Sequence, residues 1–192
     1  MIVRLQAETK MNDELHQLFV ADQQERENHP EVGTPDYVAL RSRDHTRRQQ
    51  VQQMLDLHQV ATAQDYYHAA LIFQHGETVE EIWSAHQWAL KSVALGLPAG
   101  KWLAAAALDR WHMYQGQPQK YGTQLVPDGT RYRLWDVDAS TTDQERTQWA
   151  VPSLAEMEAR AVRLTAENNG KMPPLEGAPE WLKQALVRWK IN

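Results

Sequence analysis

Hydrophobic side chains recur every three or four residues through most of the chain up to Gly116, which is the spacing of amphipathic helices. The first such stretch is rich in Gln, Glu and Asp, and its apolar residues are Leu5, Leu15, Leu18, Phe19 and Val20. We expect this helix to end before His29-Pro30, because the residue that precedes a proline is displaced from helical geometry. Thr34-Pro35 predicts the start of a second helix, which continues to about His58.

Three further helical stretches follow, separated by short turns that contain glycine or proline. Thr62 with Asp65 resembles a capping box, although Glu or Gln is the usual partner at the second position. The last stretch contains the alanine run 104–107, which allows a neighbouring helix to approach closely, so we place it centrally. Short connections of this kind join antiparallel neighbours in a bundle. The predicted helices span residues 64–74, 79–95 and 101–114, the last opened by Pro98.

The helical pattern stops at Gly116 and resumes only at Asp143. Asp128-Gly129 is a turn dipeptide between two short stretches, 123–126 and 131–135, which together predict a β-hairpin. Two isolated strands are marginally stable alone, so this hairpin is expected to pack on the helices. Beyond it we expect helices over residues 143–149, 153–168 and 180–189, with a linker rich in proline and glycine before the last of them.

These elements predict a mainly α protein: an antiparallel helical bundle with one small β-hairpin and a C-terminal helical tail. We assign residues 1–150 to a helical core with the hairpin, and residues 151–192 to a C-terminal helical extension packed on that core. At 192 residues and 42% hydrophobic content, the chain is long enough to bury one sizeable core. The alternative architecture is a solenoid of helix pairs, although the sequence shows no clear internal repeat.

Charge and composition argue against several classes of partner, and nucleic-acid binding through Arg41 to Arg48 is kept only as a weaker alternative. The net charge is −5, so no global basic field attracts nucleic acid or anionic lipid. A local group of arginines around Asp44 is expected to spread over more than one helical face and remain solvated; its members are Arg41, Arg43, Arg47 and Arg48. Cysteine is absent, which excludes thiol chemistry. Without a signal-peptide pattern or an apolar run of about 20 residues, we expect a soluble, cytoplasmic protein with no membrane contact.

Tryptophan and tyrosine are frequent, with eight and six residues against two phenylalanines. Both carry a polar group on an apolar ring and often lie where one edge is in water. Packing between helices is the simpler role for them. The alternative is an exposed patch that includes Trp83, Trp88, Trp111 or Trp149 and contacts a protein partner or a second copy of the chain.

Polar residues at four separate points of the chain are candidates for a site. Asp22 and Arg26 have the i,i+4 spacing of a helical ion pair. Gln74-His75 ends the third predicted helix, and a histidine there also suits a purely structural role against the helix dipole. Asp109-Arg110 follows the alanine run and requires a partner if buried. The loop after it either orients a ligand or fastens the hairpin, through Gln119, Tyr121, Thr123 and Gln124.

Patterns that identify a cofactor are absent from the sequence. His68 and His86, with His75, could lie on facing helices near a transition metal, but the close histidine pair of zinc-dependent peptidases is missing. We therefore assign no metal ligands and leave the cofactor unknown. No phosphate-binding glycine loop, nucleophile elbow or dinucleotide fingerprint is present. Catalysis would have to depend on Asp, His or Tyr as acid or base, or on a bound metal.

Taken together, these polar motifs resemble a bacterial family, domain-of-unknown-function family 6624. The resemblance covers about residues 20–150, and its most specific part is a Gln-x-Tyr-Gly-Thr-Gln loop, here residues 119–124. A later element matches either Val137-Asp138 or Asp143 with Arg146. No activity is established for the family, so the resemblance implies a set of residues and no reaction. The other matching motifs are Asp22-Gln23 with Arg26, Gln74-His75 and Asp109-Arg110.

If the helices bring these motifs together, they form one mixed-charge pocket that suits a small polar, zwitterionic or phosphorylated molecule. We expect hydrolysis or group transfer, with His75 or Asp109 as general base and Tyr121 beside them. A non-catalytic module for ligand sensing or protein interaction is the alternative, and the sequence does not decide whether the protein is an enzyme. The expected ligand-binding residues are Asp22, Arg26, Gln74, Arg110, Gln119, Thr123 and Gln124.

Overall fold

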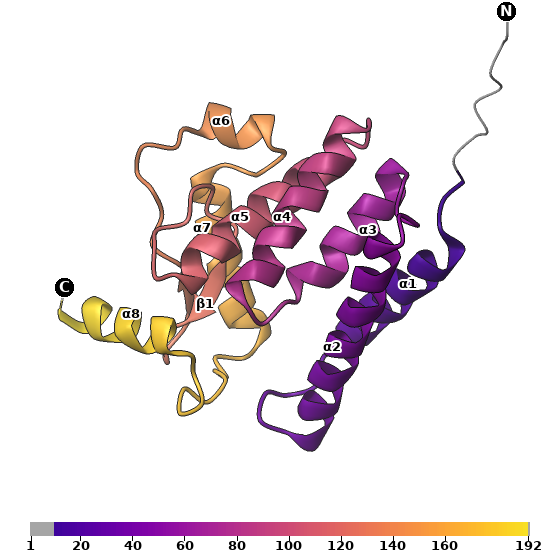
Figure 1. The fold of residues 1–192 in the computed structure, drawn as a ribbon. Helices are drawn as coiled ribbons and strands as arrows, with labels where there is room; N and C mark the ends of the chain where they lie inside the picture. The colour runs from indigo at the N-terminus through magenta and orange to yellow at the C-terminus, as the bar shows by residue number, and fades with distance from the viewer. Residues whose placement is uncertain (1–9, 192) are drawn as a thin grey trace, which may run out of the picture.

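The computed structural model describes residues 10–191, which contain eight helices and one two-stranded sheet (Figure 1). The predicted mainly α fold with one small hairpin and a C-terminal helix is confirmed. Leu5, expected in the first helix, lies outside the described residues. The helices are α1 (Asp13–Glu27), α2 (Pro35–Asp56), α3 (Ala63–Gln74), α4 (Val79–Ala94), α5 (Gly100–Tyr114), α6 (Asp143–Gln148), α7 (Leu154–Glu167) and α8 (Glu180–Ile191); the strands are β1 (Leu125–Pro127) and β2 (Tyr132–Leu134).

Most helices begin where the sequence predicts because a capping side chain accepts a hydrogen bond from a free backbone N–H of the first turn. Thr34 caps α2 in this way. The capping box predicted from Thr62 and Asp65 is present in the structure. Two more capping boxes open α4 and α7, formed by Thr78 with Glu81 and by Ser153 with Glu156. Helix α5 differs, because it begins at Gly100 without a side-chain cap.

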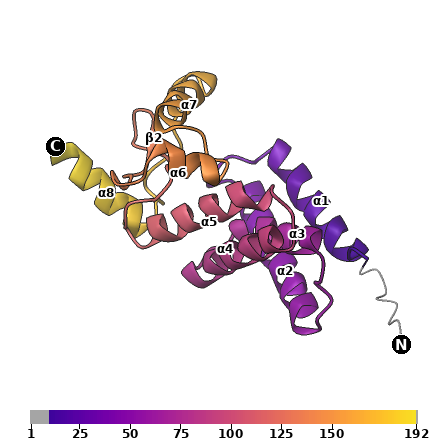
Figure 2. The same cartoon turned by 90° about the horizontal axis from the view of Figure 1, so that it is seen from above.

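Helices α3, α4 and α5 form the centre of the molecule, as two perpendicular views show (Figures 1 and 2). Helices α1 and α2 lie beside α3, while α6, α7, α8 and the hairpin lie on the side of α5. The alanines at 104–107 are buried, so α5 packs closely against its neighbours as predicted. Gly100 extends this close packing: a Cβ there would clash with Ser92 and with the Ala89 carbonyl of α4.

The hairpin packs against α8 through a cluster of buried hydrophobic residues. Strands β1 and β2 are antiparallel, with Val126 opposite Arg133. Trp135, fully buried just after β2, donates from Nε1 to the Gln117 carbonyl at 2.7 Å and meets Trp181 of α8 edge-on. This packing gives the short hairpin the support that two strands require. Within the described residues, no helix combines the length and the apolar character needed to cross a membrane.

Candidate functional site

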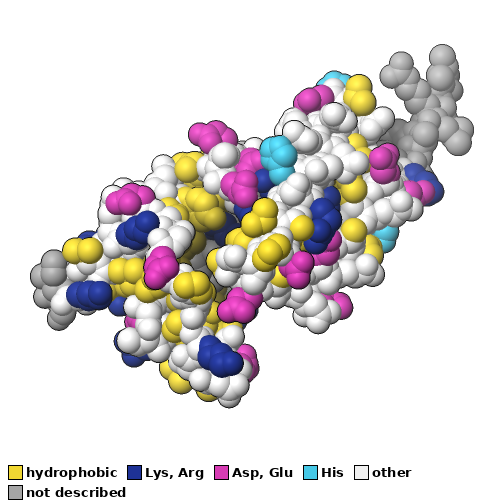
Figure 3. All heavy atoms as spheres, turned by 90° about the horizontal axis from the view of Figure 1, so that it is seen from below, with side chains coloured by type: hydrophobic (Ala, Val, Ile, Leu, Met, Phe, Trp, Pro, Cys, Tyr) yellow, Lys and Arg dark blue, Asp and Glu magenta, His cyan; other side chains and the backbone are white. Residues whose placement is uncertain are grey.

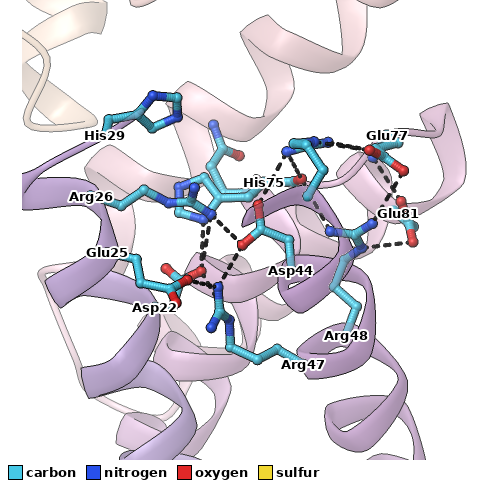
Figure 4. Close-up of polar contacts among 12 residues, drawn as sticks. Asp22, Glu25, Arg26, His29, Asp44, Arg47, Arg48, His75, Glu77 and Glu81 are labelled. Atoms are coloured by element: carbon cyan, nitrogen blue, oxygen red, sulfur yellow. Dashed lines mark hydrogen bonds and ion pairs between the residues drawn. The ribbon is translucent and has the colours of Figure 1, made fainter. Parts of the chain in front are cut away.

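The C-terminal end of α3 is surrounded by charged side chains from α1 and α2 (Figure 4). Nδ1 of His75, the C-cap residue of α3, lies 3.2 Å from Oδ1 of Asp22. Nη2 of Arg26 lies 3.2 Å from the same Asp22 oxygen and 2.7 Å from Oδ1 of Asp44. Asp22 and Asp44 are each only 1% exposed. Two buried carboxylates therefore share one guanidinium, and one of them also holds the imidazole.

The pKa directions in this group favour an ionised Asp22 and a neutral His75. Burial raises the pKa of Asp22, but the hydrogen bond from His75 and the charge of Arg26 outweigh it and hold the pKa below its ordinary value. Burial is the main cause that lowers the pKa of His75, and Arg26 and Arg110 add to the effect. A neutral imidazole beside a carboxylate carries its proton on Nδ1. Nε2 of His75 then presents a free lone pair.

Three arginines donate to the last carbonyls of α3. Arg110, from α5, donates from Nη1 to the Gln74 carbonyl at 2.8 Å. Arg41 and Arg48, both from α2, donate to the His75 carbonyl at 3.1 and 3.2 Å. Cations at this end complement the negative pole of the helix dipole and satisfy carbonyls that the helix itself leaves free.

Arg110 differs from the other two arginines in its charge balance. Arg41 pairs with Glu77 at 2.8 Å, and Arg48 pairs with Glu81 at 2.8 Å. Within residues 10–191, no carboxylate lies within 4.0 Å of the Arg110 guanidinium, whose Nε donates instead to the neutral Gln124 Oε1 at 3.2 Å. Burial lowers the pKa of Arg110, and the charge of Arg41 lowers it further. Arg110 remains protonated, since guanidinium groups do not lose their proton in proteins.

The arginine group of α2 is solvated only in part: Arg43 is exposed as expected, but for Arg47 and Arg48 the expectation was wrong. Arg47 and Arg48 are 6% and 2% exposed. Arg47 donates from Nη2 to Glu25 at 2.6 Å and to Asp44 at 2.7 Å. The reason is visible in the spacing of the sequence: Arg41, Asp44 and Arg47 are three residues apart and share one face of the helix, which packs toward the acids of α1. That spacing could have identified the buried side of α2.

Asp109 has a structural role, because its carboxylate holds the loop that follows α5. Its Oδ1 accepts from the backbone N–H groups of Lys120 and Tyr121, each at 2.8 Å. Its Oδ2 accepts from the N–H and the hydroxyl of Thr123, at 2.9 and 2.8 Å. Burial raises the pKa of this fully buried carboxyl, and the four donated hydrogen bonds oppose that rise. Because both oxygens are occupied by the loop, Asp109 does not fit the expected role of general base.

Three other expected site residues are also used to build the loop. Gln119, fully buried, donates from Nε2 to the carbonyls of Gln124 and Trp135 and accepts the Gln124 N–H on Oε1. Tyr121 is 4% exposed, and its ring packs 6.0 Å from Trp149, centroid to centroid. Burial raises the pKa of the Tyr121 phenol. These residues and Thr123 fasten the loop to α5 and the hairpin, and neither Tyr121 nor Thr123 hydrogen-bonds to His75.

The structure therefore divides the ten expected site residues into two groups. The first, which we name the arginine–histidine cluster, lies at the end of α3 and comprises Asp22, Arg26, Gln74, His75, Arg110 and Gln124. The second, the loop-anchoring group, comprises Asp109, Gln119, Tyr121 and Thr123. Gln124 connects the two groups, since it accepts from Arg110 and donates from Nε2 to Thr123 Oγ1 at 3.0 Å.

Several nitrogen atoms of the arginine–histidine cluster have no hydrogen-bond partner within the described residues and are not fully buried. They are Nη2 of Arg110, Nη1 of Arg26, Nε2 of His75 and Nε2 of Gln74. In contrast, Oε1 of Gln74 is buried without a partner. Figure 3 shows the surface hollowed near the middle of one face, with basic side chains inside the hollow and hydrophobic ones along its edges.

The remaining candidate histidines have separate surroundings. The ring of His68 stacks on Phe19 at 4.2 Å between centroids, and His86 Nδ1 lies 2.8 Å from the Ala104 carbonyl. Within residues 10–191, no group of three or more His, Asp or Glu side chains is arranged to hold a metal ion. The three histidines considered from the sequence thus do not share a site.

The fold and the cluster define a mainly helical protein with a partly buried Asp–His pair beside a guanidinium that has no carboxylate partner in the described chain. No family model, curated protein or solved structure matches the chain. The resemblance to domain-of-unknown-function family 6624 therefore stays a prediction from the motifs alone.

Proposed function

We propose that this protein binds a small anionic molecule at the arginine–histidine cluster and acts on it as a hydrolase or group-transfer enzyme. The observation that carries the proposal is Arg110. Removing a charge from water is costly unless an opposite charge compensates it. Each other arginine that contacts the end of α3 has carboxylate partners, whereas Arg110 has only amide and carbonyl oxygens within the described residues. An anionic ligand would supply the missing charge.

The accessible donors of the cluster suit such a ligand. Nη2 of Arg110 and Nη1 of Arg26 belong to charged groups, and hydrogen bonds from charged donors are shorter and stronger than neutral ones. Nε2 of Gln74 adds a neutral donor from the helix end itself. Two guanidiniums and one amide close to His75 would give both charge and orientation to a small anion.

His75 is the residue equipped for catalysis. Asp22 holds its Nδ1 at 3.2 Å, which fixes the tautomer and the orientation of the ring. The His75 side chain is 21% exposed, and its Nε2 makes no hydrogen bond within the described residues, so this atom can accept a proton or attack an electrophile. Asp22 is accordingly a positioning residue. Of the three residues expected from the sequence to be catalytic, His75 alone has a reactive atom with these properties; Asp109 and Tyr121 are committed to the loop.

Anion binding is tested by calorimetric titration with inorganic phosphate and with acetate, followed by the same titrations on two arginine variants. Arg110→Met removes the uncompensated guanidinium but keeps much of its length. Arg160→Met is the matched control, because Arg160 is exposed on α7 and lacks an ion-pair partner within the described residues. We expect the first variant to lose at least about tenfold in affinity, or about 1.4 kcal/mol, and the control to bind as the wild type does. Equal affinity in both variants, or no anion binding at all, would contradict the proposal.

A role in protein interaction is the second candidate, and one surface feature favours it. Trp83 of α4 is 39% exposed and lies 4.8 Å from Trp111 of α5, centroid to centroid. Trp88 and Trp149 are partly buried in hydrophobic clusters and do not extend this surface. Sedimentation of the wild type and Trp83→Ala over a range of concentrations tests self-association. An association that is unchanged in Trp83→Ala would rule out this pair as the contact.

A further inference from the structure

We propose that the anionic group bound at the arginine–histidine cluster is a phosphoryl group, and that Nε2 of His75 accepts it covalently before passing it to water or to a second molecule. This inference rests on the proposed function and specifies its substrate class: phosphorylated compounds whose leaving group departs as a stable anion, such as acyl or aryl phosphates.

The donors of the cluster favour phosphoryl over acyl transfer. Acyl transfer is usually stabilised by backbone N–H groups that form an oxyanion hole. The end of α3 offers carbonyl oxygens instead, and those of Gln74 and His75 already accept hydrogen bonds from arginines. The accessible donors are charged guanidinium groups of Arg110 and Arg26, the type that clamps a transferring phosphoryl group and its three peripheral oxygens.

A carboxylate ligand has too few oxygen atoms to accept a hydrogen bond from each donor of the cluster separately. One arginine can bind a carboxylate through two parallel hydrogen bonds. Here Arg110 and Arg26 come from different helices, α5 and α1, and both are close enough to His75 to lower its pKa. Gln74 adds a third donor next to His75 in the sequence. Three separate donors match the three non-bridging oxygens of a phosphoryl group better than the two oxygens of a carboxylate.

His75 is the nucleophile that the cluster offers. Its neutral form has a lone pair on Nε2, and Asp22 stabilises the imidazolium that forms when this nitrogen bonds to phosphorus. The Thr123 hydroxyl of the loop-anchoring group donates to Asp109 and accepts from Gln124. No serine or threonine hydroxyl is hydrogen-bonded to any member of the arginine–histidine cluster except Thr123 to Gln124, within the described residues.

The proposed reaction has two steps. In the first, the Nε2 lone pair forms a bond to phosphorus while the bond between phosphorus and the leaving oxygen breaks, and that oxygen departs with the electron pair. The Nδ1 proton stays in the hydrogen bond to Asp22. In the second, a water oxygen bonds to phosphorus, the phosphorus–nitrogen bond breaks, and its electron pair returns to Nε2. The attacking water releases one proton to solvent. A leaving group that is stable as an anion needs no general acid.

The test incubates the full-length protein with acetyl phosphate and measures the intact mass after quenching in alkali, where a phosphorus–nitrogen bond survives, and in acid, where it hydrolyses. We expect the mass of one phosphoryl group after the alkaline quench and its loss after the acid quench. His75→Ala should abolish the added mass. His45→Ala is the matched control, because His45 is an exposed histidine on α2, and it should be labelled like the wild type.

Two further measurements separate the outcomes. His75→Gln guards against a folding defect, since its circular dichroism and its affinity for inorganic phosphate can be checked; we expect it to bind phosphate and to remain unlabelled. Asp22→Asn should lower the rate of labelling by at least about tenfold, because it removes the charge that stabilises the imidazolium. If the wild type binds inorganic phosphate but is never labelled, or if His75→Ala is labelled equally, the covalent step is wrong and anion binding stands. If phosphate does not bind, both proposals fail.

Discussion

Replacing Asp109 provides the sharpest test of how the loop after α5 is held in its conformation. The Asp109 carboxylate is fully buried and accepts three backbone N–H groups and one hydroxyl from the loop that follows α5. Asp109→Ala leaves the three N–H groups without their acceptor in a site that water does not easily reach. We therefore expect the loop to lose its fixed conformation and the free energy of unfolding to fall.

The size of the loss follows from the number of donors. Each buried N–H left without an acceptor costs about 1–3 kcal/mol, so three of them cost about 3–9 kcal/mol if the loop does not rearrange. Two effects reduce this figure. The variant no longer buries a carboxyl whose pKa is raised by burial, and the loop can move toward solvent. We expect a net loss of about 3–5 kcal/mol, a large part of the 5–15 kcal/mol typical of a whole domain.

Asp109→Asn should give a smaller loss, because its amide oxygen can still accept from Lys120 and Tyr121. Its NH2 group then faces the Thr123 N–H, so one donor remains unsatisfied and the expected loss is about 1–3 kcal/mol. Urea unfolding followed by far-ultraviolet circular dichroism measures both values. Asp138→Asn is the control, since Asp138 is exposed and its carboxylate accepts hydrogen bonds only from the neighbouring Ser140; its effect should stay within about 0.5 kcal/mol. Equal losses for Asp109→Asn and Asp138→Asn would refute the reasoning.

Three other predictions concern the pH dependence and the packing of the fold. Burial lowers the pKa of His68 to about 4, below its ordinary 6.5, so the unfolded chain binds this proton more tightly than the folded chain does. The contribution of His68 to the free energy of unfolding should be complete above pH 6.5 and fall by about 3 kcal/mol toward pH 4. His68→Gln should reduce this pH dependence, and an unchanged dependence would contradict the prediction. Gly100→Ala should cost about 1–3 kcal/mol in urea unfolding, because the new Cβ meets Ser92 and the Ala89 carbonyl, and an unchanged midpoint would contradict this close packing. Leu182→Ala should cost about 2–5 kcal/mol by the cavity that it leaves between α8 and the hairpin, whereas a loss below about 0.5 kcal/mol would mean that α8 does not stabilise the hairpin.

The helices could be predicted because their boundaries depend on local chemistry. Thr62 and Ser153 cap their helices through side chains only three residues from their partners, so the signal lies within one turn of sequence. The start of α5 was predicted within one residue, but the need for a glycine at position 100 was not predicted. A Cβ there would meet Ser92 of α4, and such a tertiary constraint leaves no local pattern. Local signals therefore located the elements, while their packing did not follow from them.

The candidate site was harder to predict because residues adjacent in sequence need not share a role. Consecutive residues on a helix point about 100° apart. Asp109 consequently faces the loop, whereas Arg110 faces the end of α3. The pairing of Asp22 with His75, two residues 53 positions apart, likewise depends on how α1 packs against α3. The sequence could identify these side chains as candidates, but it could not divide them into the arginine–histidine cluster and the loop-anchoring group.

The division also implies that the two groups are coupled through Gln124. Its backbone N–H is held by Gln119, its Nε2 donates to the Ala106 carbonyl and to Thr123, and its Oε1 accepts from Nε of Arg110. The three contacts with Gln119, Ala106 and Thr123 thus hold Gln124 in place independently of the guanidinium. An Arg110 held only by the Gln74 carbonyl would be free to rotate, and orienting it would then cost conformational entropy on ligand binding. The loop therefore supports the proposed anion site without contacting the anion.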